Sequence, residues 1–134
     1  MALNRYLYPQ KGTNIVQECT LSTRVSLSGA GAVTGIVAGK GLTVTAGATN
    51  YTVTFDNAST VSGVLNVNAQ FITNAAFDKT KHQVATVRST SSTGCVIELY
   101  DLQLGTAALA DVAGDLCITI VCTLSSVEIG RAHV

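Results

Sequence analysis

Alternation of apolar and polar residues is the dominant pattern along this chain. Over residues 19–27 the odd positions are mostly apolar, and the even positions hold Thr, Ser and Arg. Over residues 116–124 the pattern recurs with the opposite parity, ending in Cys122 and Leu124. Because successive side chains of a β-strand point to opposite faces, each segment predicts a strand with one buried face.

Shorter segments of the same kind lie between turn signals. Tyr51, Val53 and Phe55 share one face of a predicted strand, which forms a hairpin with residues 42–45 across a loop containing Gly47. Residues 64–72 predict a strand with Leu65, Val67, Ala69 and Phe71 turned inward. Further strands are predicted over residues 33–37, 82–89 and 95–102. Residues 104–114 are Ala-rich and predict a loop.

About eight short strands with little helical periodicity predict an all-β fold. We expect an antiparallel β-sandwich, jelly-roll-like, formed by one domain over residues 13–127. An N-terminal arm, residues 1–12, precedes it, and residues 128–134 form a tail that fits no element. The only proline, Pro9, lies in the arm, so no predicted strand is interrupted by proline.

Composition excludes some classes of partner. Charged residues make up 12% of the chain, against about 25% in typical domains, and the formal net charge is zero. Without a basic patch we expect no nucleic-acid partner. The arm lacks the apolar core of a signal peptide, and no run approaches a membrane span, so we expect no membrane partner. The low charge hints that neighbouring subunits cover part of the surface.

Four cysteines occur, and none shows the close spacing of a metal site. Cys117 and Cys122 are five residues apart, so on one strand they face opposite sides. We expect Cys19, Cys95, Cys117 and Cys122 to be free, buried thiols that act as small hydrophobes. This expectation favours a reducing site of folding.

Candidate catalytic groups are few. No serine of the chain lies in the Gly-x-Ser-x-Gly motif of a nucleophile that His82 could activate, and His82 is expected to be solvated at the edge of a strand. Glu18 and Glu98 are expected to face outward from strands. The remaining carboxylates fall at turns or strand ends: Asp56, Asp78, Asp101, Asp111 and Asp115. The segment 35–41 lacks the spacing of a phosphate loop. We therefore expect no catalytic residue, no cofactor and no metal.

The two ends of the chain carry distinct signals. Arg5, Tyr6, Leu7 and Tyr8 place apolar side chains outside the strand set, and these need cover. They either pack on their own domain or dock on a neighbouring subunit or a larger assembly, where Arg5 would pair with a carboxylate. The last six residues, which begin at Ile129 and end at Val134, resemble a translated sequencing adapter. That resemblance implies a non-native tail and a metagenomic source.

Three segments together resemble small virion proteins of tailed bacteriophages, including head-decoration proteins. They are the arm Arg-Tyr-Leu-Tyr-Pro-Gln at residues 5–10, the Gly-Lys-Gly turn at 39–41 followed by Tyr-Thr-Val-Thr-Phe at 51–55, and the closing strand before Ser-Ser-Val at 125–127. The resemblance implies a β-sandwich scaffold, frequent trimers and no active site.

The function expected from this resemblance is a capsid decoration and stabilising protein. Its partners would be copies of itself, with a trimer favoured, and the major capsid protein or another virion protein. Its location would be the virion, assembled in the cytoplasm of the host bacterium. One alternative is a carbohydrate- or receptor-binding β-module of a phage tail or fibre. Another is an enzyme fragment, which predicts a pocket holding His82 and a carboxylate.

Overall fold

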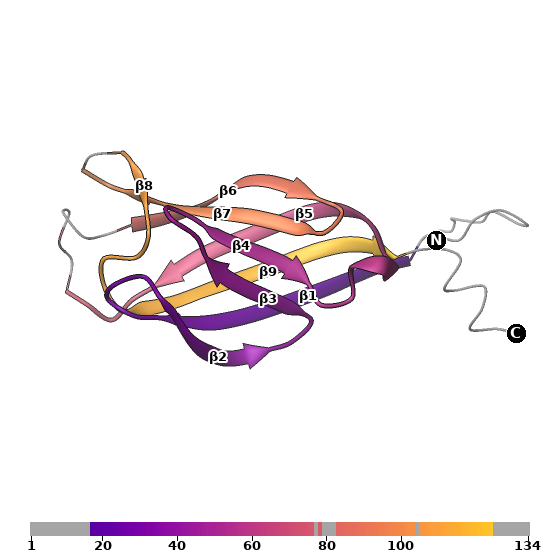
Figure 1. Cartoon of the computed structure of the whole chain (residues 1–134), viewed down its shortest axis with the longest axis horizontal. Helices are drawn as coiled ribbons and strands as arrows, with labels where there is room; N and C mark the ends of the chain where they lie inside the picture. Colours follow the sequence, from indigo (N-terminus) through magenta and orange to yellow (C-terminus); the bar gives the residue numbers. More distant parts are fainter. Residues whose placement is uncertain (1–16, 77, 79–82, 104, 125–134) are drawn as a thin grey trace, which may run out of the picture.

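The fold is a sandwich of two antiparallel β-sheets. A computed structural model describes residues 17–76, 78, 83–103 and 105–124. Sheet A has the strand order β2-β1-β9-β5 and sheet B the order β3-β4-β7-β6, with β8 paired to β7 (Figure 1). The strands of sheet A are β2 (Val33–Gly39), β1 (Gln17–Leu27), β9 (Gly114–Leu124) and β5 (Val61–Ile72). Those of sheet B are β3 (Leu42–Ala46), β4 (Tyr51–Phe55), β7 (Gly94–Asp101), β6 (Gln83–Ser91) and β8 (Ala107–Ala108).

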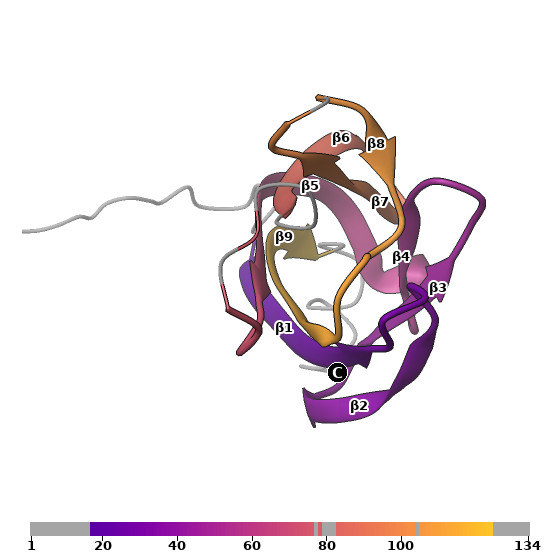
Figure 2. The same cartoon turned by 90° about the vertical axis from the view of Figure 1, so that its left-hand side faces the viewer.

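The first and last described strands lie together in the centre of sheet A. β1 and β9 pair without a register shift from Gln17 opposite Leu124 to Leu27 opposite Gly114. The start of β1 and the end of β9 therefore lie at the same end of the sandwich. Figure 2, the end-on view, shows β5 beside β6 on one side, while β2 lies toward the other.

The core lies between the sheets and is built from the inward parity of each strand. β9 contributes Leu116, Ile118, Ile120 and Cys122, each no more than 1% exposed. The other buried apolar residues are Val25, Leu27, Leu42, Val44, Tyr51, Val53, Phe55, Cys95, Ile97, Leu99 and Ala110. Removal of this apolar area from water is the main force that holds the two sheets together.

The predicted all-β sandwich is confirmed. The strand Tyr51–Phe55 has the predicted bounds, and the predicted inward faces of β1 and β9 are the buried ones. Several strands are longer than predicted, and the two-residue β8 lies inside the segment that was expected to be a loop. A 3₁₀ turn, Ala58–Thr60, leads into β5. The predicted arm (1–12) and tail (128–134) lie outside the described residues.

One predicted inward residue, Leu65, is 56% exposed, so that prediction was wrong. The cause is a register shift between Val64 and Asn66 in the pairing of β5 with β9. An extra residue in a strand reverses the parity on one side of it. Val64 packs against the core in place of Leu65, and Val67, Ala69 and Phe71 keep the predicted side.

Candidate functional site

Several predicted site residues lie outside the described part of the chain. These are the arm residues Arg5, Tyr6, Leu7 and Tyr8 and the histidine His82. Their roles therefore stay predictions. The remaining candidates are the described carboxylates, cavities, exposed apolar side chains and thiols.

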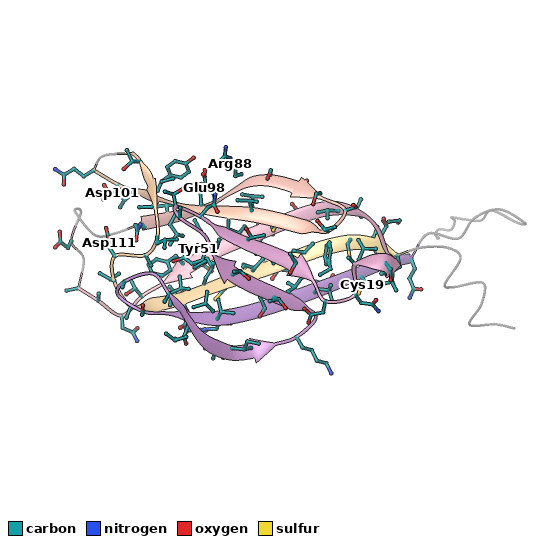
Figure 3. The ribbon with its side chains drawn as sticks, viewed as in Figure 1. Cys19, Tyr51, Arg88, Glu98, Asp101 and Asp111 are labelled. Carbon is teal, nitrogen blue, oxygen red and sulfur yellow. The ribbon has the colours of Figure 1, made fainter. Side chains whose placement is uncertain are left out.

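A buried carboxylate lies on the outer face of sheet B. Glu98 is 6% exposed, although its position in β7 points away from the core. Tyr100 donates its hydroxyl to one carboxylate oxygen at 2.6 Å, and Arg88 Nη1 donates to the other at 3.1 Å. Figure 3 labels Arg88 and Glu98 near each other on this side of the sandwich. The hydrogen bond to Glu98 and its negative charge raise the pKa of the Tyr100 phenol. Both oxygens are thus engaged, which suits a structural ion pair better than a general base.

A second carboxylate lies on the outer face of sheet A. Asp115 accepts hydrogen bonds from Arg24 Nε at 2.7 Å and from the Ser26 hydroxyl at 3.3 Å. These side chains come from neighbouring positions of β1 and β9. The bond and the charge of Asp115 raise the pKa of Arg24. Because Asp115 and Glu98 lie on the outer faces of different sheets, they cannot work as a pair across one cleft.

Among the described residues, no three His, Cys, Asp or Glu side chains gather in a way that could hold a metal ion. In that part of the chain there is also no helix with the length and hydropathy to cross a membrane.

Hollows follow the outer face of sheet A. One of about 420 Å³ is lined by Arg24, Asp115 and Asn74 among others. One of about 380 Å³ lies over Asn68, Gln70 and Thr119. A smaller hollow of about 220 Å³ lies between them: it shares Arg24 with the first and Thr119 with the second. Because the smallest hollow shares residues with the other two, we call the three together the trough. Its lining mixes apolar residues such as Ile72 and Ala69 with amides, hydroxyls and the Arg24–Asp115 ion pair, which can donate and accept hydrogen bonds.

Buried polar side chains fix one end of the sandwich. Tyr51 donates its hydroxyl to the Gly31 carbonyl at 2.7 Å and accepts from the Ala110 amide at 3.1 Å. Gln83 donates to the Leu109 carbonyl at 3.1 Å and accepts from the Asp111 amide at 2.8 Å. These four bonds tie sheet B to the loop between β1 and β2 and to the segment that leads into β9. They use both hydrogen-bonding ends of Gln83 and both functions of the Tyr51 hydroxyl, so these two side chains act as supports of the fold.

The strand β2 is the most exposed apolar element of the described chain. Its sequence, Val-Thr-Gly-Ile-Val-Ala-Gly, has no charged residue. Ile36 is 64% exposed and Val37 is 53% exposed. β2 is the outer strand of sheet A and is bonded on one side to β1. Its register shifts leave Thr34 and Val37 as extra residues opposite β1.

The four cysteines are free, as expected, but they are not equally buried. Cys95 and Cys122 are buried, whereas Cys19 and Cys117 are partly exposed, so the expectation of four buried thiols was half correct. Burial raises the pKa of Cys95 to about 11. Cys117 and Cys122 lie on opposite faces of β9, as their spacing predicted.

Sequence analysis missed the polar contacts that join distant residues. The Arg88–Glu98–Tyr100 cluster and the Tyr51 and Gln83 bonds depend on strand neighbours whose pairing no motif announces. The one available signal was the shared parity of Glu98 and Tyr100 on a single strand.

Comparison with protein families, with curated proteins and with solved structures finds no match to this chain.

Proposed function

We propose that this chain is a structural protein of a bacteriophage particle, which decorates and stabilises the capsid through contacts with copies of itself and with capsid subunits. The observation that carries the proposal is the exposed, uncharged edge strand β2. The resemblance of the arm, the 39–55 segment and the closing strand to small phage virion proteins supplies the biological setting.

The apolar edge of β2 needs cover. Monomeric proteins protect their edge strands with charges, prolines or bulges, because an open edge invites pairing. β2 has bulges but carries no Lys, Arg, Asp or Glu. Ile36 and Val37 lie at a bulge of β2 and are both more than half exposed, so each side chain could meet a neighbour. This arrangement favours side-chain packing against another subunit over simple extension of the sheet.

The rest of the surface favours the same function. Only 12% of residues are charged, so few ions would lose water when this surface is buried. A protein that stabilises a shell acts by adding interface area that is lost when the shell opens. The Tyr51 and Gln83 bonds support the sandwich under such a load, and the outer-face carboxylates Glu98 and Asp115 are each held in an ion pair.

The test is the solution mass of the full chain, measured by light scattering over a range of concentrations. We expect a closed oligomer, with three copies favoured. Ile36→Lys should shift the mass toward the monomer, because an ammonium group would be buried in the interface. Thr45→Lys is the matched control, since Thr45 is an exposed residue of β3 and should leave the mass unchanged.

The arm gives a second measurement. If the arm docks on a neighbouring subunit, the oligomer mass should fall toward that of the monomer when four arm residues are all replaced by Ala: Arg5, Tyr6, Leu7 and Tyr8. An unchanged mass would limit the arm to its own domain or to the capsid. A wild-type chain that stays monomeric at every concentration, with Ile36→Lys identical to it, would contradict the assembly function.

The trough on sheet A favours a second candidate, a receptor-binding module that recognises neutral surface sugars. Asn68 and Gln70 offer amides in a row on β5, and Thr119 offers a hydroxyl beside them. Amides and hydroxyls are the groups that hydrogen-bond sugar hydroxyls. A glycan array with the full chain tests this candidate: binding lost in Asn68→Ala but kept in Thr52→Ala, an exposed position of sheet B, would support it. An array with no bound glycan would contradict it.

A further inference from the structure

Cys19 on β1 and Cys122 on β9 face each other on the two adjacent central strands of sheet A. They are direct partners in the register of β1 with β9, although they lie 103 positions apart in the chain. Both side chains point toward the core side of the sheet. We propose that these two thiols are a site of reversible oxidation, at which a cross-strand disulfide joins the start of β1 to the end of β9.

The backbone already has the spacing that a disulfide needs. Directly opposed residues of an antiparallel pair have Cα atoms about 4.5–5.5 Å apart, and disulfides span Cα distances of about 4.4–6.8 Å. The Cys122 thiol donates to the Cys19 carbonyl at 3.5 Å, so the sulfur already lies against its partner residue. Burial and the adjacent Cys19 both raise the pKa of Cys122, which agrees with two thiols in contact.

The other two cysteines have no comparable partner. Cys95 lies in β7, a strand of sheet B, and Cys117 lies on the outer face of sheet A opposite Arg24. Cys117 and Cys122 belong to one strand and point to opposite sides of it. Since all four cysteines fall within the described part of the chain, the pair Cys19 and Cys122 is the one that register selects.

The two thiols differ in access, and this sets the order of the reaction. Cys19 is partly exposed and Cys122 is buried. A small disulfide such as oxidised glutathione is attacked by the Cys19 thiolate, which forms a mixed disulfide and releases one glutathione thiolate. Cys122 then loses its proton and attacks the Cys19 sulfur, which forms the protein disulfide and releases the second glutathione. The protein loses two electrons and two protons, and one glutathione disulfide becomes two thiols.

The position of the pair gives the bond a mechanical consequence. Gln17 opposes Leu124 just two residues from the pair, at the end of sheet A where the described chain begins and stops. Figure 3 shows Cys19 at this end, far from Asp101 and Asp111 at the other. A force that pulls Gln17 and Leu124 apart would separate β1 from β9 at this end first. A disulfide at this point transfers the load to a covalent bond, whether or not the proposed capsid function holds.

The experiment compares the full chain equilibrated in oxidised glutathione with the same chain in reduced glutathione. Free thiols are counted after denaturation in an acidic quench, and the melting temperature is measured in both states. We expect the oxidised chain to lose two of its four thiols and to melt higher by on the order of 10 °C, because the bond closes a long loop. Cys117→Ser should behave like the wild-type chain, and Cys19→Ser should show no intramolecular bond and no shift.

Peptide mapping assigns the bond and needs no variant at the pair itself. In the Cys117→Ser chain, cleavage after Lys and Arg and before Asp isolates Cys19 on residues 12–24 and Cys122 on residues 115–131. A linked pair of these two peptides, separated by a reductant, is the expected result. Four thiols that persist at every ratio of oxidised to reduced glutathione, or a bond that maps to Cys95, would overturn the proposal.

Discussion

The hydroxyl of Tyr51 offers the sharpest test of how the two sheets are held together. Tyr51 is fully buried, and its hydroxyl serves the Gly31 carbonyl and the Ala110 amide, both of which are buried as well. Tyr51→Phe removes one oxygen atom and keeps the ring, so the packing of the core changes little. What changes is that a buried carbonyl and a buried amide lose their hydrogen-bond partner.

The expected cost follows from those two groups. A buried donor or acceptor left without a partner costs about 1–3 kcal/mol, and the hydroxyl itself no longer has to be desolvated. We therefore expect Tyr51→Phe to lower the free energy of unfolding by about 2–3 kcal/mol. For a domain of this size, the melting temperature should fall by on the order of 10 °C.

Urea denaturation and hydrogen exchange together check this reasoning. The urea midpoint should fall with an unchanged slope, and the Ala110 amide should exchange faster while amides of β9 keep their relative protection. Ser22→Ala is the control: its hydroxyl is also removed, but it bonds the Thr119 hydroxyl on the exposed outer face of sheet A, where water can replace it, so its effect should be clearly smaller. If Tyr51→Phe unfolds at the wild-type midpoint and the Ala110 amide stays protected, the hydroxyl does not hold the two sheets together.

Three further predictions concern other supports of the fold. Gly94 has φ +151°, and a Cβ there would overlap the Val53 carbonyl, so Gly94→Ala should cost about 2–4 kcal/mol in urea denaturation; Gly35→Ala, with open space around it, should cost far less. Gln83→Ala should speed amide exchange at Asp111 while β1 amides stay protected, and equal exchange in both chains would contradict the role given to Gln83. The folded-state pKa of Cys95, about 11 against its ordinary 9.0, adds stability that is complete below pH 9 and is lost as pH rises toward 11. That loss should be about 2–3 kcal/mol. In a denaturation series over this pH range, the free energy of unfolding should fall less steeply for Cys95→Ala than for the wild-type chain. Part of the remaining fall comes from Tyr51, whose pKa burial also raises.

The amino-acid sequence by itself determined the class of fold and most of the buried face. Alternation with a period of two is a local property, because each side chain of a strand points opposite to the one before it. It therefore predicted the inward residues of β1, β4 and β9 correctly. Turn residues located most strand boundaries for the same reason, since glycine and asparagine act on the backbone at their own position.

Tertiary structure decided everything that depends on which strand lies beside which. The bulge at Leu65 exists because β5 must keep register with β9, and nothing in residues 64–66 alone specifies it. The burial of Glu98 depends on Arg88 and Tyr100, and the exposure of Ile36 depends on the place of β2 at the edge of sheet A. The Cys19–Cys122 pair is the clearest case: 103 positions separate two thiols that strand pairing sets face to face, because register is a property of the whole sheet.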